Sequence, residues 1–228
     1  MGDYMSVDIL VRWLHVMFGV AWVGLLYYFN FIQGEYFKEA DPAAKADATQ
    51  KLVPRALKWF RWSAMFTFLT GLYLLHLIHR SHGINSYIVM GALMGILMFL
   101  NVWLIIWPKQ KIVCGMVEGD IPSAAAKALL ASRTNTLFSA PMLLGMLGSY
   151  HGGGHAAKLV AGAAIDNTAA RAMGMGGIGT GLWIVIAVII LLEINAVVGK
   201  LGPMRSVVGV VHISLALALV FLGLIQFV

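Results

Sequence analysis

The residues of this sequence best suited to chemistry are histidines in or beside long apolar segments. His15 lies near the start of an apolar run at residues 11–32, and His76 lies near the end of a second run at 58–79. An ionisable side chain within a membrane segment is costly unless it is paired or ligated, so it marks a candidate functional site. By helical rise, we expect both histidines at a similar depth, near the same membrane face.

Two imidazoles at matched depth on facing helices are the arrangement that holds a b-type haem. We therefore predict that His15 and His76 are axial ligands of a haem b, with His151 as the alternative partner of His15. Arg12 would lie where a haem propionate emerges, because its guanidinium suits a carboxylate. The other interpretation is that these are interfacial histidines, hydrogen-bonded to water or to backbone carbonyls.

A second hypothesis is a copper or zinc site at the same membrane face. Its ligands would be the other histidines that gather there, with two methionines as soft thioether ligands for copper(I). These candidates are His76, His79, His82, His151, His155, Met173 and Met175. A spacing of three residues between histidines at a helix end also arises by chance, so the pattern alone does not decide.

Glu193 and His212 form a separate candidate centre. Each lies about seven residues from the turn at 200–205, so an antiparallel hairpin would place the two side chains at one depth. A carboxylate and an imidazole buried together should pair, because each alone is expensive in a membrane. We predict a polar clasp between these two helices; the alternative is a proton relay, or a carboxylate that orients a liganding histidine.

The composition identifies the scaffold that must position these residues. The chain has 228 residues, of which 60% are hydrophobic and 11% are charged. Soluble domains carry roughly 25% charged residues, so this is predicted to be an integral membrane protein. The net charge of +6 is better explained by membrane topology than by nucleic-acid binding. The single cysteine excludes an internal disulfide.

We predict an all-α bundle of about six transmembrane helices, since lipid forces backbone polar groups to be satisfied within each segment. The chain is read as one membrane domain, 1–228, with no cleavable signal peptide ahead of the first helix. Two short interfacial helices are expected on the cytoplasmic side, at 41–58 and 122–133. The predicted transmembrane segments are 11–32, 58–79, 86–107, 134–151, 177–199 and 206–228.

The basic residues of the connecting loops predict the orientation. Loops 33–57, 108–133 and 200–205 carry most of the lysines and arginines, so they are expected in the cytoplasm. Both termini would then lie on the outer, periplasmic side of a bacterial inner membrane.

Several blocks resemble the membrane domain of the bacterial membrane-bound urate oxidase (urate hydroxylase) family. The most specific is Asn101-Val-Trp103 followed by Trp107-Pro-Lys-Gln-Lys111. The remaining blocks, in the family's order, are Arg12-Trp-Leu-His15-Val16, Ala21-Trp-Val-Gly24, Lys58-Trp-Phe-Arg-Trp62, and Ser132-Arg-Thr-Asn135 to Pro141-Met142. The sequence departs from the family in having no Cys-x-x-Cys-His motif for a covalent haem c.

The resemblance implies a haem b redox protein that passes electrons to a separate cytochrome c at the outer face. If the chain is itself an oxidoreductase, its substrate would be a purine or another small reduced molecule. The alternatives are the copper- or zinc-handling protein described above and a cofactor-free accessory subunit of a larger membrane complex. Membrane lipid is an expected partner in each case, and a homo-oligomer is compatible with all three.

Overall fold

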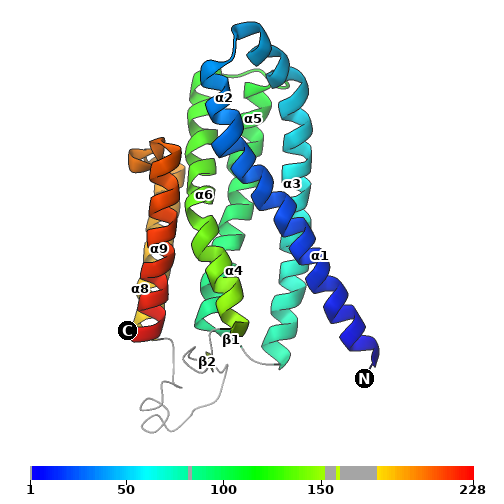
Figure 1. Cartoon of the computed structure of the whole chain (residues 1–228), viewed down its shortest axis with the longest axis vertical. Helices are drawn as coiled ribbons and strands as arrows, with labels where there is room; N and C mark the ends of the chain where they lie inside the picture. Colours follow the sequence, from blue (N-terminus) through cyan, green and yellow to red (C-terminus); the bar gives the residue numbers. More distant parts are fainter. Residues whose placement is uncertain (1, 82–83, 152–157, 160–178) are drawn as a thin grey trace.

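The structure is a computed structural model that describes residues 2–81, 84–151, 158–159 and 179–228 (Figure 1). Within these residues the fold is all-α, as predicted, with one addition: two strands of two residues each pair antiparallel. Two π-helical turns, η1 and η2, continue helices without a break, and η4 is a 3-10 turn. The elements are α1 (Gly2–Tyr27), η1 (Tyr28–Gln33), α2 (Gly34–Glu39), α3 (Pro42–Ser81), β1 (Ile84–Asn85), α4 (Ser86–Leu100), η2 (Asn101–Ile106), α5 (Trp107–Val113), α6 (Ile121–His151), β2 (Lys158–Leu159), α8 (Thr180–Val198), η4 (Gly202–Arg205) and α9 (Val207–Phe227).

Five helical segments of the described chain are long and apolar enough to cross a membrane, which indicates an integral membrane protein. They are Val7–Glu39, Pro42–Arg80, Ser86–Val113, Thr180–Val198 and Val207–Phe227. The fourth predicted crossing belongs to α6, which is more polar and is not one of the five. Helix α6 runs along the bundle beside α4, so within the described residues α1, α3, α4, α6, α8 and α9 all pass along the bundle axis, and both termini lie at the same end (Figure 1).

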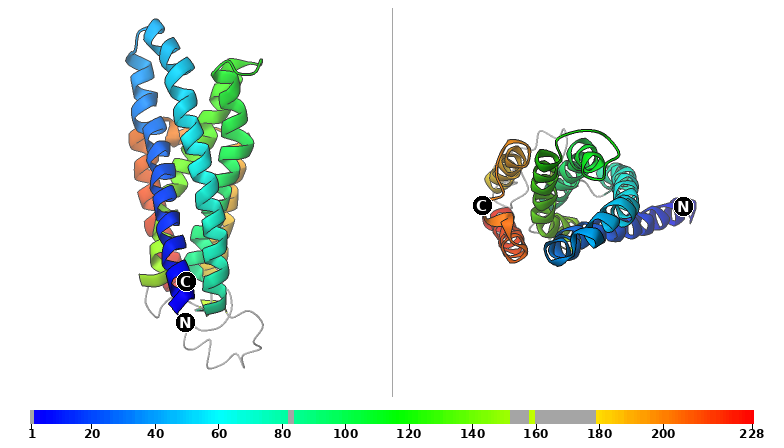
Figure 2. Two further views of the ribbon diagram at one scale, coloured as in Figure 1. Left: turned by 90° about the vertical axis from the view of Figure 1, so that its right-hand side faces the viewer. Right: turned by 90° about the horizontal axis from the view of Figure 1, so that it is seen from above.

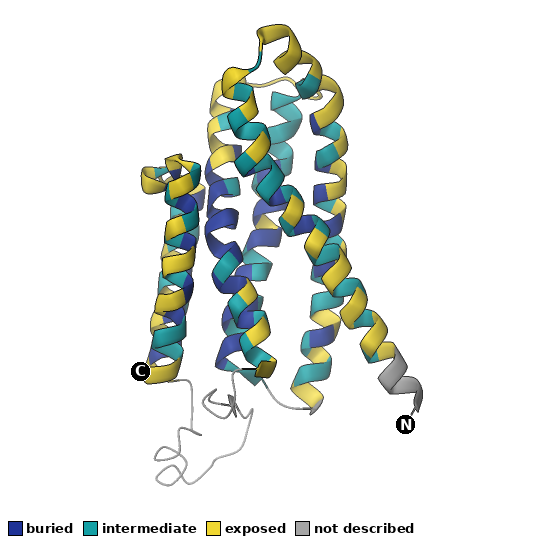
Figure 3. Ribbon diagram, in the orientation of Figure 1, coloured by how far each residue is buried: buried dark blue, intermediate teal, exposed yellow. Residues whose placement is uncertain are grey.

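Helix α6 is the central element of the bundle. It contacts α4, α5, α8, α9 and α1, and the hairpin of α8 and α9 packs against its side (Figure 2). Its polar residues from Arg133 to Thr136 are buried, as is Ser139. Buried residues accordingly concentrate along α6 and the surfaces facing it (Figure 3). Neighbouring helices keep these polar groups away from lipid, where they would be costly, and Asn135 and Ser139 also form hydrogen bonds to side chains of other elements.

The two predicted interfacial helices are helical but are not separate elements. Residues 42–58 are the first part of α3, and 122–133 are the first part of α6. Both stretches are rich in alanine, a strong helix former, so the helix continues where the hydrophobic run ends. The 40 residues of α3 span about 60 Å, twice the thickness of a hydrocarbon core. The end of the bundle that carries α2, the start of α3, α5 and the start of α6 is called the basic end below (top of Figure 1).

Glycines allow α4 and α6 to cross closely. A Cβ added to Gly145 would lie 2.8 Å from the backbone nitrogen of Gly91 and from the carbonyl oxygen of Tyr87. At Gly95, the other glycine of the GxxxG pattern in α4, the nearest atom to an added Cβ is a flexible methionine methyl at 3.9 Å. Close packing therefore depends on Gly91 and Gly145, across two helices, rather than on the two glycines of one helix.

An arginine packed among tryptophans joins α3 to the η2–α5 segment near the basic end. The guanidinium of Arg61 lies 3.9 Å from the ring centroid of Trp107 and 5.2 Å from that of Trp103. Cation–π contacts of this kind are strengthened where water is partly excluded. Two of the blocks that resemble urate oxidases thus meet in space.

Candidate functional site

His15 lies on α1 against α3, and its hydrogen bond defines its tautomer. Its Nδ1 is 3.0 Å from the hydroxyl oxygen of Thr70. That hydroxyl donates its own proton to the backbone carbonyl of Phe66, at 2.6 Å, so it can only accept from His15. Nδ1 therefore carries the proton and Nε2 carries the lone pair, which is the nitrogen that a liganding histidine presents to a metal.

Gly71 provides the space for the His15 ring. A Cβ added at Gly71 would lie 3.0 Å from Cε1 of His15 and 3.6 Å from its Nδ1. The ring is therefore packed directly on the backbone of α3, and together with the Thr70 hydroxyl this contact fixes its position. The half-buried imidazole of His15 is a pre-oriented donor of one lone pair.

The structure does not bring the predicted partners to His15. Gly71 marks the face of α3 toward His15, and His76 is five residues further on, about 140° around the helix, with an exposed side chain. His151 is exposed at the end of α6, where its ring lies edge-on to Tyr150. Arg12 is paired with Asp8 on the same exposed face of α1, Nε to Oδ2 at 2.9 Å. The spacing along each helix predicted the depth of these histidines, but it did not predict the direction in which each side chain points around the helix axis.

The remaining histidines give no metal centre in the described part of the chain. His79 is exposed, and His82, His155, Met173 and Met175 lie outside the described residues. Among the residues that the structure describes, no three or more His, Cys, Asp or Glu side chains are grouped so that they could hold a metal ion.

The predicted pair of Glu193 and His212 is wrong. Glu193 on α8 accepts a hydrogen bond from Nδ2 of Asn101, at 3.1 Å. His212 on α9 is exposed, and its Nδ1 lies 2.8 Å from the carbonyl oxygen of Val208 in its own helix. The hairpin between α8 and α9 places both residues at a similar depth, but Glu193 is directed toward Asn101 of η2 and the His212 side chain is exposed.

Glu193 belongs instead to a chain of hydrogen bonds through the bundle core. Asn101 also donates to Oδ1 of Asn135, at 3.0 Å, and Asn135 in turn donates to the carbonyl oxygen of Met98, at 2.9 Å. Both asparagines are at most 1% exposed. Both side chains are buried and hydrogen-bonded to groups on other elements, so they connect η2, α6 and α8 and help to fix the packing of these three elements. Sequence reasoning identified Asn101 and Asn135 as parts of blocks but gave them no structural role.

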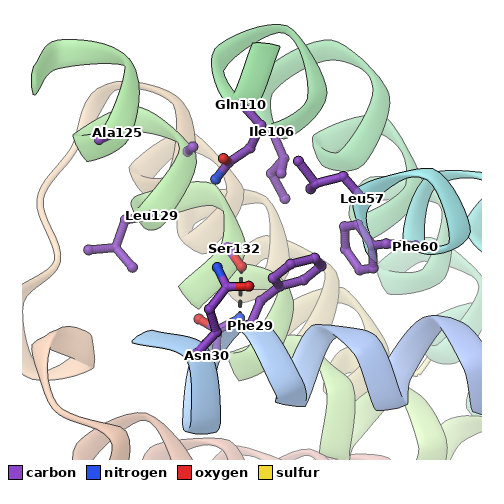
Figure 4. Close-up of a pocket in the computed structure, with 11 residues that line it drawn as sticks. Phe29, Asn30, Leu57, Phe60, Ile106, Gln110, Ala125, Leu129 and Ser132 are labelled. Carbon is purple, nitrogen blue, oxygen red and sulfur yellow. Dashed lines mark hydrogen bonds between the residues drawn. The ribbon is translucent and has the colours of Figure 1, made fainter. Parts of the chain in front are cut away.

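A cavity of about 160 Å³ lies at the basic end, between η1, α3, η2, α5 and α6 (Figure 4). Its lining residues are Phe29, Asn30, Gln33, Leu57, Phe60, Ile106, Gln110, Ala125, Ala128, Leu129 and Ser132. Asn30 donates to the hydroxyl oxygen of Ser132 at 2.7 Å, and the Phe29 and Phe60 rings pack edge to face with centroids 5.5 Å apart. Sequence reasoning missed this cavity; isolated amide residues beside apolar runs were its only sequence signal.

Both π-helical turns border the cavity. Asn30 and Gln33 lie in η1, and Ile106 ends η2. A π-helical turn is rare and is frequently found at functional sites. Their position therefore favours a functional role for this region.

A comparison with protein families finds one relationship. Residues 78–165 match the family model described as "Urate oxidase N-terminal". Over these residues the chain is similar to urate oxidases. The matched segment contains α4, η2, α5 and α6, and with them Asn101 and Asn135, while His15 and Glu193 lie outside it. No curated protein and no solved structure matches the chain. The resemblance to urate oxidases inferred from the sequence is confirmed for this segment, which covers less than half of the chain.

Proposed function

We propose that the chain is a membrane redox protein related to urate oxidases, in which His15 is the protein's ligand to a haem b. In this proposal electrons pass to a separate cytochrome c at the end of the bundle where the termini lie. The observation that carries it is the locked tautomer of His15, because a ring held by Nδ1 presents a lone pair at Nε2. The match to urate oxidases supports the redox assignment.

Of the histidines expected from the sequence, His15 would hold the haem, whereas His76 and His151 are not placed to hold it with His15. His15 is oriented by Thr70 and seated on Gly71, whereas His76 and His151 are exposed and are directed elsewhere. The chain would therefore supply one histidine to the iron. When bound, the haem would supply one-electron chemistry at a potential set by its ligand and its burial.

The surrounding residues have two tasks in this account. Thr70 keeps the proton on Nδ1 and so prevents the ring from turning its N–H toward a ligand. The contact between α1 and α3 continues beyond His15 through buried apolar residues, namely Trp22, Leu26 and Ala64. This packing holds the two helices at the spacing that the His15 ring requires.

The test is electron transfer by the purified protein. In detergent, with urate as reductant and a soluble c-type cytochrome as acceptor, we expect cytochrome reduction by the wild-type protein and by His76→Ala. With His15→Ala the rate of cytochrome reduction should be at least tenfold lower than with the wild type, although the variant elutes as a folded protein on size exclusion. Equal rates for His15→Ala and the wild type, or no reduction by any form, would overturn the proposal.

A further inference from the structure

A buried arginine of α6 has N–H groups without an acceptor. Arg133 is 4% exposed, and its Nε and Nη1 are buried with no hydrogen-bond partner among the described residues. A guanidinium keeps its charge inside a protein, and a buried charge without a partner costs more free energy than an unpaired neutral group. The position of Arg133 in a native core therefore calls for an anion that accepts from these two nitrogens.

The carboxylate that acts on Arg133 is that of Glu35 in α2, and it already has a partner. Glu35 interacts electrostatically with Arg133, but both of its oxygens accept from Nζ of Lys38 at 2.8 Å. In the part of the chain that the structure describes, none of the salt bridges includes Arg133. An anion from outside the chain can therefore supply the acceptors that Glu35 does not supply.

Arg133 lies at the depth where lipid headgroups are expected. Helices α8 and α9 have 19 and 21 residues, which corresponds to about 30 Å, the thickness of a hydrocarbon core. The turn between them, which contains η4, therefore falls at the membrane interface, while α3 and α6 continue past it toward the tip of the basic end (Figure 1). The residues one turn before and after Arg133 on α6, Leu130 and Leu137, belong to one buried cluster. Its other buried members are Met204 of η4 and Val210 of α9, so Arg133 is level with this interface.

The charges on the neighbouring elements favour an anionic lipid over a zwitterionic one. Four cationic side chains are exposed there, namely Lys38 of α2, Lys127 of α6, Lys200 of the turn and Arg205 of η4. Basic pockets between transmembrane helices at the cytoplasmic face bind acidic lipid headgroups. A guanidinium also suits a phosphate, because two parallel N–H groups can donate to two phosphate oxygens. A choline or ethanolamine headgroup would bring its own cation next to these positive charges.

We propose that Arg133 binds the phosphodiester of an anionic phospholipid, of the phosphatidylglycerol class, from the leaflet at the basic end. The phosphate oxygens accept from the guanidinium, and the acyl chains lie in the adjoining bilayer. Because Arg133 is level with the cluster that joins α6 to η4 and α9, the bound headgroup stabilises this junction. The proposal uses none of the residues that hold His15, so it does not depend on the proposed haem.

The experiment is native mass spectrometry of the purified full chain in detergent, titrated with dioleoylphosphatidylglycerol or dioleoylphosphatidylcholine. For the first lipid bound to the wild type, we expect a Kd about tenfold lower for phosphatidylglycerol than for phosphatidylcholine. Arg133→Met removes the guanidinium and keeps a long side chain, so it should raise the Kd for phosphatidylglycerol about tenfold. Arg55→Met is the matched control, because it removes the same charge from an exposed position of α3 and should leave this Kd unchanged. Arg133→Lys keeps the charge without the planar fork and should give an intermediate Kd.

Two further measurements complete the test. Thermal unfolding in the same detergent should show that phosphatidylglycerol raises the Tm of the wild type more than that of Arg133→Met. Excess sodium phosphate, compared with sodium chloride at equal ionic strength, distinguishes a lipid headgroup from free phosphate and should not displace the bound lipid. The proposal would be overturned by a wild type without preference for phosphatidylglycerol, by equal Kd values for the wild type and Arg133→Met, or by displacement of the lipid by phosphate alone.

Discussion

The close contact between α4 and α6 gives the sharpest test of the packing, through Gly145→Ala. The new Cβ would lie 2.8 Å from two backbone atoms of α4, against 3.4 Å for the closest ordinary contact. Neither atom can turn away, so the helices must separate by about 0.6 Å. A gap of this size forfeits about a quarter of the dispersion energy of the atoms across it.

The expected magnitude follows from two opposing effects. Overpacking of a tight contact costs about 2 kcal/mol, while replacing glycine by alanine within a helix contributes about 1 kcal/mol of stability. Gly145→Ala should therefore lose about 1 kcal/mol. Gly95→Ala is the matched control, because it gains the same helix propensity and its Cβ makes only an ordinary van der Waals contact, with the nearest atom at 3.9 Å.

The assay is thermal unfolding of both variants in the same detergent, followed by tryptophan fluorescence. A difference of about 2 kcal/mol between the variants corresponds to about 4–8 °C in Tm for a chain of this size, with Gly145→Ala the less stable. Equal Tm values, or a higher Tm for Gly145→Ala, would refute the close crossing of α4 and α6.

Three further predictions concern the polar core, the reactivity of Cys114 and the orientation. Glu193→Leu should lower the free energy of unfolding by about 1–2 kcal/mol, because α8 loses its hydrogen bond to Asn101. Glu193→Gln keeps an acceptor and should unfold near the wild-type temperature. Equal Tm values for the two variants would contradict this role of Glu193. Burial raises the pKa of the Cys114 thiol, so a smaller thiolate fraction is present at neutral pH and labelling should accelerate as pH rises. In the orientation predicted from the loop charges, a membrane-impermeant maleimide should label Cys114 in inverted vesicles and not in right-side-out spheroplasts; the reverse pattern would contradict that orientation.

The sequence predicted those features that depend on one segment at a time. Long apolar runs marked the crossing helices to within a few residues at most ends, because a membrane span needs a minimum length of apolar residues. The stretches at 41–58 and 122–133 were predicted as separate interfacial helices, but residues 42–58 and 122–133 belong to α3 and α6, since hydropathy reports where lipid ends and not where a helix ends.

The sequence could not predict contacts that depend on helix rotation. His76 was predicted at the correct end of α3, but its side chain lies on a different face of the helix from the one toward His15. Glu193 was predicted to pair with His212 of the same hairpin, whereas its hydrogen-bond partner is Asn101 of η2. The cavity is formed by η1, α3, η2, α5 and α6 together, and the local widening at its π-helical turns has no pattern in apolar periodicity.

The central claim is that His15 binds haem iron, and the absorption spectrum tests it most directly. Oxidised and dithionite-reduced spectra of the detergent-purified protein should show a Soret band, which is lost in His15→Ala and retained in the matched variant His76→Ala. A wild-type protein without a Soret band when expressed with ample haem, or a band unchanged by His15→Ala, would contradict the account.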